Sequence, residues 1–280
     1  MKKIKKILLI GPGASLGDFN LNYLKGKTTL YFGTGLKFFE ENNIYPTYFT
    51  FLDPNGVLNF HYSVFGGVDP FGEGFTHPDN VKRFNVKKST FDEKWVKGLK
   101  ENTDIIYNNL QGTQAFYGSG FSTSRGHDWN VNTFGKEILP KLSNCFKNAH
   151  IVDTIVCWDT YQSLLDDNEV KGKKISSLCP IIRWNKKDEF GAFKNTDKFC
   201  SYIIPLIISQ FSNIKTIECV GFGDFGKSRL YEKKDGEEDA YRGFKEHFDF
   251  MKDQISEILE MKKIKIKFLN KNSYYKELEK

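Results

Sequence analysis

The fold class is decided near the amino terminus, by Ile4-Lys5-Lys6-Ile7-Leu8-Leu9-Ile10-Gly11-Pro12-Gly13-Ala14-Ser15-Leu16-Gly17. The apolar run that ends at Ile10 has the length and composition of a buried strand. Gly11 and Gly13 follow it at once, and glycines in this position predict a tight turn into the next element. A strand followed by a glycine turn and a further element indicates the start of an α/β domain.

The same order of apolar strand and polar tip returns along the chain. The run 28–32 ends in Gly33-Thr34-Gly35, and the run 48–52 ends in Asp53-Pro54-Asn55-Gly56, which cannot continue a central strand. The run 214–220 ends in Gly221-Phe222-Gly223-Asp224. We therefore predict a mainly parallel sheet flanked by helices, with these tips converging at one edge.

Helices are predicted between these strands. Thr90 and Glu93 have the spacing of a capping box, and the segment 199–211 is nearly all apolar despite Pro205. In 241–261 the residues at helical spacing are Phe244, Phe248, Met251, Ile255, Ile258 and Leu259. The expected strands are 4–10, 28–32, 48–52, 104–108, 151–158, a segment near Ile175, 214–220 and 264–269; the expected helices are 36–42 with Leu36, Phe38 and Phe39 inward, 89–102, 134–146 with a break at Pro140, a helix to about Asp167, 199–211 and 241–261.

The middle of the chain is poorer in such patterns. The segments 59–85 and 111–132 are rich in glycine and aromatic residues, and the second is typical of lids and binding loops. We expect one α/β nucleotide-binding domain over residues 1–280, with a loop-rich insertion at about 56–132.

Composition and charge exclude several classes of protein. The 280 residues are 39% hydrophobic and 27% charged, which is typical of a globular chain with a real core. The 41 Lys and Arg against 35 Asp and Glu leave a net charge of +6, which favours anionic ligands. No concentrated basic stripe is present, so nucleic-acid binding is not predicted.

The cysteines and the apolar runs bear on localisation. The five cysteines form no CxxC pair, which indicates neither a zinc site nor a disulfide framework and fits a reducing cytoplasm. The run that ends at Ile10 is too short for a signal peptide, and no apolar run approaches the roughly 20 residues of a membrane-spanning helix. We expect a cytoplasmic protein, in solution or peripheral at the inner membrane face.

The candidate site residues each have a structural alternative. The turn 11–16 offers backbone N–H groups that could bind phosphate, but it is neither GxGxxG nor a Walker A motif and could be only a tight turn. Asp53 could bind a ribose or cap its own turn, and capping explains it better when it is taken alone. Asp224 and Tyr231 place a carboxylate and a phenol after the most hydrophobic strand. His247 flanks the apolar face of its helix, where periodicity favours packing over catalysis.

Four motifs follow one another along the chain: Ile7-Leu8-Leu9-Ile10-Gly11-Pro12-Gly13-Ala14-Ser15-Leu16, Phe32-Gly33-Thr34-Gly35, Ile44-Tyr45-Pro46-Thr47-Tyr48 leading to Asp53, and Val220-Gly221-Phe222-Gly223-Asp224-Phe225 with Tyr231. In this order they resemble two related groups of proteins. One is the small bacterial CMP-sialic acid sialyltransferases of glycosyltransferase family 42. The other is the DUF115 group, which includes motility-accessory-factor flagellin glycosyltransferases and archaeal hydroxymethylpterin pyrophosphokinase-like proteins. Both imply a Rossmann-like fold, a variant of GT-A, that binds a nucleotide or nucleotide-sugar.

The family's site residues transfer position by position over about 4–55 and 198–270. An asparagine after the second strand of the sialyltransferases falls on Gly33 or Thr34. The asparagine after their third strand falls on Asp53, the residue usual in the DUF115 group. Of their two phosphate-contacting tyrosines, the first is replaced by Gly226 and the second falls on Tyr231, while the catalytic histidine falls on His247. The nucleotide-binding residues implied are Gly11, Gly13, Ala14, Ser15, Leu16, Gly33, Thr34, Asp53, Ser201, Gly221 and Asp224.

The resemblance implies a metal-independent glycosyltransferase. It would move a sugar from a nucleotide-activated donor, CMP-nonulosonic acid by preference, to a hydroxyl acceptor such as a glycan, with no further cofactor. His247 would be the general base and Tyr231 would donate to the leaving phosphate. Two alternatives stay open: a pyrophosphokinase-like enzyme in which Asp53 and Asp224 bind magnesium and ATP, and a nucleotide-binding accessory protein without catalysis. The oligomeric state is not predicted.

Overall fold

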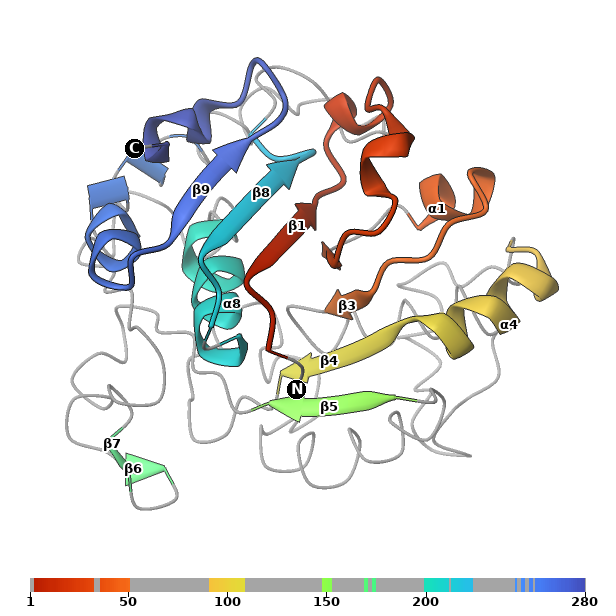
Figure 1. Cartoon of the computed structure of the whole chain (residues 1–280), viewed down its shortest axis with the longest axis horizontal. Helices are drawn as coiled ribbons and strands as arrows, with labels where there is room; N and C mark the ends of the chain where they lie inside the picture. Colours follow the sequence, from red (N-terminus) through yellow and green to blue (C-terminus); the bar gives the residue numbers. More distant parts are fainter. Residues whose placement is uncertain are drawn as a thin grey trace, which may run out of the picture.

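The computed structural model describes a parallel sheet and the segments that cover it. The residues described are 3–32, 36–50, 91–108, 148–152, 169–170, 173–174, 199–211, 213–223, 245, 248–249, 252–253 and 255–279. Seven strands pair in the order β5-β4-β3-β2-β1-β8-β9, and most of them are labelled in Figure 1. Every pair in this sheet is parallel. The strands are β1 (Lys6–Ile10), β2 (Thr29–Phe32), β3 (Tyr48–Thr50), β4 (Asp104–Asn108), β5 (Ala149–Val152), β8 (Thr216–Val220) and β9 (Lys265–Phe268).

The central position of β1 follows from its composition, because a strand that is covered on both faces must be apolar throughout. Ile7, Leu8, Leu9 and Ile10 are at most 1% exposed. On one side Leu8 pairs with Thr29, and on the other it pairs with Glu218. The strand order runs outward from β1 to β5 on one side and from β8 to β9 on the other, so it changes direction between β1 and β8.

Most strand predictions are confirmed, with small differences at the ends. The strand 104–108 has the predicted bounds, whereas β5 begins at Ala149, two residues before the predicted start. Ile175, near which a further strand was expected, lies outside the described residues. Just before it, β6 (Glu169–Val170) and β7 (Lys173–Lys174) pair antiparallel in a separate two-stranded sheet.

One face of the sheet, called the α8 face, is covered by helices. Ile7 and Leu9 of β1 and Ile217 and Cys219 of β8 point to this face and pack in one cluster with residues of α8 (Ile204–Gln210). The predicted helix 199–211 is present in two parts, because a π-helical turn, η8 (Phe199–Ile203), precedes α8. Pro205 lies in the first turn of α8, where a missing N–H removes no α-helical hydrogen bond.

The predicted long helix 241–261 also packs on the α8 face. Its described residues are helical, and Phe248, Ile255 and Leu259 are buried as expected, while Met261 is 66% exposed. Phe244 and Met251 lie outside the described residues. The side chains of Cys200 and Cys219 are buried in this face.

The opposite face, called the η2 face, is covered by two short 3-10 helices and by α-helices. Leu8 and Ile10 of β1, Tyr31 of β2 and Val220 of β8 point to it. The covering elements are η1 (Ala14–Leu16), η2 (Leu21–Leu24), α1 (Lys37–Glu41) and α4 (Glu93–Asn102). The predicted inward residues of α1 are confirmed, because Leu36, Phe38 and Phe39 are all buried.

The start of α4 corrects the predicted capping box. The helix begins at Glu93, and its N-cap is Asp92, whose carboxylate accepts a hydrogen bond from the Trp95 N–H at 2.9 Å. Asp92 is a stronger cap in this position because its side chain reaches the third helical N–H directly. Thr90 lies outside the described residues, and so does the expected insertion 56–132 apart from residues 91–108.

The described part of the chain ends in a short helix that packs on the sheet. A short 3-10 helix, η9 (Tyr274–Leu278), follows β9 and buries Tyr274, Tyr275 and Leu278 on the α8 face. Among the helices in the described ranges, none is long and apolar enough to cross a membrane. The predicted helices 134–146 and that ending near Asp167 fall outside those ranges.

Candidate functional site

The glycine turn lies at the carboxyl end of the central strand, where the strand order changes direction. In open α/β sheets ligands bind at such a point, outside the carboxyl ends of the strands. The turn is attached to the neighbouring strand: the Gly11 N–H donates to the Val220 carbonyl and the Gly13 N–H donates to the Gly221 carbonyl, both at 2.9 Å. The pairing of β1 with β8 therefore continues past the ends of both strands.

Glycine is required at Gly11 and Gly221 because their backbones pass too close for side chains. A Cβ on Gly11 would lie 2.4 Å from the Gly221 oxygen, and a Cβ on Gly221 would lie 2.3 Å from the Gly11 oxygen. Gly221 also has a φ of +73°, which L side chains rarely adopt. These two glycines therefore allow the tips of β1 and β8 to lie against each other.

The backbone donors of the turn are partly used within the protein. Gly13 is extended, with φ −64° and ψ 156°, and its carbonyl accepts the Leu16 N–H at 3.0 Å. Leu16 is 1% exposed, and its packing in the η2 face fixes the end of the turn against the sheet. Within the described ranges the N–H of Ala14, the first residue of η1, donates to no protein acceptor. Ala14 is half-buried, which leaves its N–H as a donor available to a ligand at this edge.

The tip of β8 is held by residues that sequence reasoning missed. The Asn270 amide donates to the Phe222 carbonyl at 2.9 Å, and the Tyr274 N–H donates to the Gly223 carbonyl at 3.1 Å. A Cβ on Gly223 would lie 2.6 Å from the Tyr275 ring. The end of β9 and η9 therefore close the β8 side of the carboxyl edge. The signal available in the sequence was the Gly-x-Gly spacing at 221–223, which indicated a tight tip but not its partner.

Ser201 lies on a helical turn beside this tip. The turn is η8, which starts with Phe199, and the Phe199 ring lies 4.9 Å from that of Phe222 and 4.5 Å from that of Tyr275. The backbone of Ser201 therefore belongs to a segment that begins next to the end of β8.

The remaining predicted site residues cannot be placed individually. Gly33, Thr34, Asp53, Asp224, Tyr231 and His247 lie outside the described residues. The strands that lead to Asp53 and Asp224 are β3 and β8, which are parallel members of one sheet. The expectation that these strands end at the same edge is confirmed, and the distance between the two carboxylates stays a prediction.

A buried carboxylate lies on the η2 face, away from the glycine turn. Glu218 of β8 is 4% exposed, with Lys6 at 2.7 Å and Lys27 at 3.5 Å, and the Tyr23 hydroxyl donates to it at 2.8 Å. Burial raises the pKa of Glu218, but the hydrogen bonds from Lys6 and Tyr23 and the charges of Lys6 and Lys27 outweigh burial and lower it. Glu218 is thus an ionised group that ties η2 to the sheet.

The Cys219 thiol and the possible metal-ligating side chains are the other candidate reactive groups. Burial raises the pKa of the Cys219 thiol well above its ordinary range, so Cys219 is an inert packing residue. Across the described portion of the chain, no three His, Cys, Asp or Glu side chains gather in a way that could hold a metal ion.

Comparison of the chain with protein-family models, with curated proteins and with solved structures found no match. The resemblance to the sialyltransferase and DUF115 groups therefore rests on the motifs quoted above.

Proposed function

We propose that the protein binds a nucleotide or nucleotide-sugar at the carboxyl edge of the sheet and transfers its glycosyl group to a hydroxyl acceptor. The observation that carries the proposal is the position of the turn 11–16, at the end of the central strand and next to the change in strand order. This is the place where nucleotides bind in Rossmann-like sheets. The choice of a glycosyl transfer comes from the motif resemblance.

The geometry of the turn supports a definite role for Ala14. The N–H groups of Gly11 and Gly13 donate to β8, so they fix the turn. The N–H of Ala14 follows directly and is the donor that this fixed turn presents to a phosphate. A donor held rigidly by its neighbours loses little entropy on binding, which favours its use in a site.

In the proposed reaction the bond between the anomeric carbon and the donor phosphate breaks, and a bond forms between that carbon and the acceptor oxygen. His247 takes the acceptor proton, and Tyr231 donates a hydrogen bond to the phosphate of the departing nucleotide. These two roles are predictions from the sequence. The proposal needs no metal ion, because the departing charge is stabilised by protein donors.

The first test is a thermal-shift screen with CMP, CDP, UDP, GDP and ATP, each with and without magnesium. A rise in melting temperature with CMP alone supports the proposal, because a ligand that binds only the folded state stabilises it. A rise that requires both ATP and magnesium would instead support the pyrophosphokinase-like alternative. The absence of any shift would contradict nucleotide binding.

The second test addresses Ala14 through a backbone change. Ala14→Pro removes one N–H group while keeping the fold, because proline suits the first position of a helical turn and Gly13 has the extended backbone that a following proline requires. We expect nucleotide binding to weaken about tenfold or more, as for a lost hydrogen bond to a charged group. Ala14→Ser, which keeps the N–H, is the matched control. Equal nucleotide affinity of the proline variant and the wild type would remove Ala14 from the site.

A further inference from the structure

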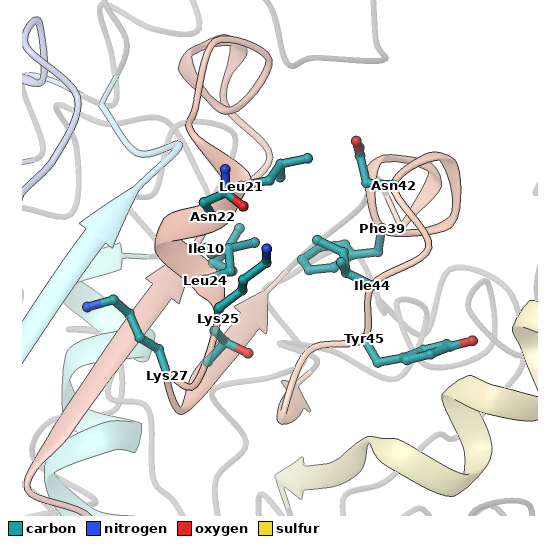
Figure 2. Close-up of a pocket in the computed structure, with 11 residues that line it drawn as sticks. Ile10, Leu21, Asn22, Leu24, Lys25, Lys27, Phe39, Asn42, Ile44 and Tyr45 are labelled. Carbon is teal, nitrogen blue, oxygen red and sulfur yellow. The ribbon is translucent and has the colours of Figure 1, made fainter.

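A cavity lies on the η2 face, between η2 and α1 (Figure 2). Its volume is about 340 Å³, which falls in the range of roughly 300–1,000 Å³ found for small-molecule sites. Ile10 and Thr29 of the sheet are among its lining residues, with Leu24 on the side of η2 and Phe39 on the side of α1. Most of the lining is apolar, as is usual in ligand pockets.

The cavity results from the way in which β1 is connected to β2. A parallel crossover normally carries a helix that covers the sheet. Here the connection carries only η1, of three residues, and η2, of four residues. The bonds of Tyr23 and Lys27 to Glu218 hold η2 toward β8, on the side away from α1. The space over Ile10 and Thr29 is therefore kept open by a fixed cluster of polar contacts.

The two lysines of the lining differ in where they point. Lys27 contacts Glu218 at 3.5 Å and lies over the Tyr23 ring at 3.8 Å, so it is engaged outside the cavity. The side chain of Lys25 extends into the space between η2 and α1 (Figure 2). Within the described ranges Lys25 has no carboxylate within 4.0 Å, and none of the lining residues is acidic. The lining thus combines an apolar floor with one available cation.

We propose that this cavity is a second small-molecule site, which takes an organic monoanion with a flat apolar body of one or two rings. The apolar body would pack against Phe39 and Leu24, and the carboxylate would meet the Lys25 ammonium. Lys25 and Ile44 lie just before β2 and β3 along the chain, at the amino edge of the sheet. Ile10 in the floor of the cavity directly precedes the glycine turn, but Lys25 lies at the opposite edge of the sheet. The existence of this site does not depend on the proposed function.

The test measures binding of indole-3-acetate and of its neutral analogue indole-3-acetamide to the full chain by isothermal titration calorimetry. We expect the acid to bind at one site and more tightly than the amide, by about three- to tenfold, because a partly exposed ion pair contributes modestly. In Lys25→Gln the affinity for the acid should fall to that for the amide. Lys25 is exposed, so this variant is expected to fold normally.

Two variants locate the probe and control for general charge. Leu21→Trp places a larger side chain in the lining of the cavity and should abolish binding of both probes. Lys262→Gln removes an exposed lysine remote from the cavity and should leave both affinities unchanged. Failure of the acid to bind, equal affinity for acid and amide, or full binding by Leu21→Trp would each overturn the proposal. Titration with a nucleotide remains a separate measurement, whose result bears only on the glycine turn.

Discussion

The two faces of the same sheet are closed in different ways. On the α8 face, Ile217 and Cys219 pack under a helix whose residues Ile204 and Ile207 are fully buried. On the η2 face, Glu218 lies between those two residues along the strand and is held by Tyr23 of η2 and by Lys27, which follows η2 along the chain. A strand can therefore carry a charge on the face that is covered by a short polar turn, while its other face stays apolar. The covering segments differ in the side chains they offer to β8, because α8 offers apolar side chains and η2 offers the hydroxyl of Tyr23.

The largest expected difference between the faces comes from removing one apolar side chain on each. Ile207→Ala should lower the free energy of unfolding by about 3–4 kcal/mol, because it opens a cavity in a close-packed layer. Leu24→Ala should lower it by only about 1 kcal/mol, because Leu24 is half-buried beside an existing cavity. Urea unfolding of both variants gives the comparison. Equal losses would mean that the η2 face is packed as tightly as the α8 face.

The second largest effect on stability is expected where β1 pairs with β8, because both faces of the sheet depend on this pairing. Gly221→Ala should lower the free energy of unfolding by about 3 kcal/mol, because it combines a positive φ with a clash against the Gly11 oxygen. Gly26→Ala is the matched control, since Gly26 has a φ of +69° but open space around its Cβ position. It should lose about 1 kcal/mol, as expected for backbone strain alone. If the two variants lost the same free energy, the close approach of the tips would not matter for stability.

The smallest effect is the pH dependence carried by Glu218. Its pKa in the folded protein is below the ordinary value of 4.5, so its contacts stabilise the protein above that value. This contribution is lost as the pH falls below about 4.5 and through the lower folded pKa. Glu218→Gln should therefore lower the free energy of unfolding by about 1 kcal/mol at pH 7, and the difference from the wild type should shrink as the pH falls below 4.5.

The control for Glu218 is a variant that changes its partner but not its charge. Tyr23→Phe removes one hydrogen bond to the carboxylate and should lower stability by up to about 1 kcal/mol, while the loss of stability in acid is kept. Unfolding curves measured from pH 3 to pH 7 separate the two variants. A pH profile of Glu218→Gln identical to that of the wild type would show that the carboxylate does not contribute.

The parts of the fold that were predicted are those set by local periodicity. β1 and β4 are apolar runs bounded by polar residues, so their positions could be read from the sequence. The inward faces of α1 and of the helix 241–261 follow from helical spacing, as Phe39, Phe248 and Ile255 show. The position of the glycine turn at the end of a central strand was also predictable.

The parts that were missed depend on contacts between residues far apart in the chain. Tyr23 and Glu218 are separated by 195 residues, so no local pattern marks Glu218 as a buried carboxylate within an apolar strand. Asn270 reaches Phe222 across 48 residues, and its role at the β8 tip has no local signature. The cavity was not predicted because its presence depends on where η2 is held, and that position is set by the same distant contacts.

The pairing of β1 with β8 also affects how fast the chain folds. Lys6 pairs with Thr216, so one edge of β1 stays unpaired until the segment about two hundred residues later has been synthesised. Pairing across such a separation is slow, because the entropy cost of closing a long loop comes before the stabilising contacts between the strands form. During synthesis the apolar edge from Ile7 to Ile10 stays unpaired and could associate with other chains. A chain that stops before β8 would keep this edge permanently and should be found with chaperones or in aggregates.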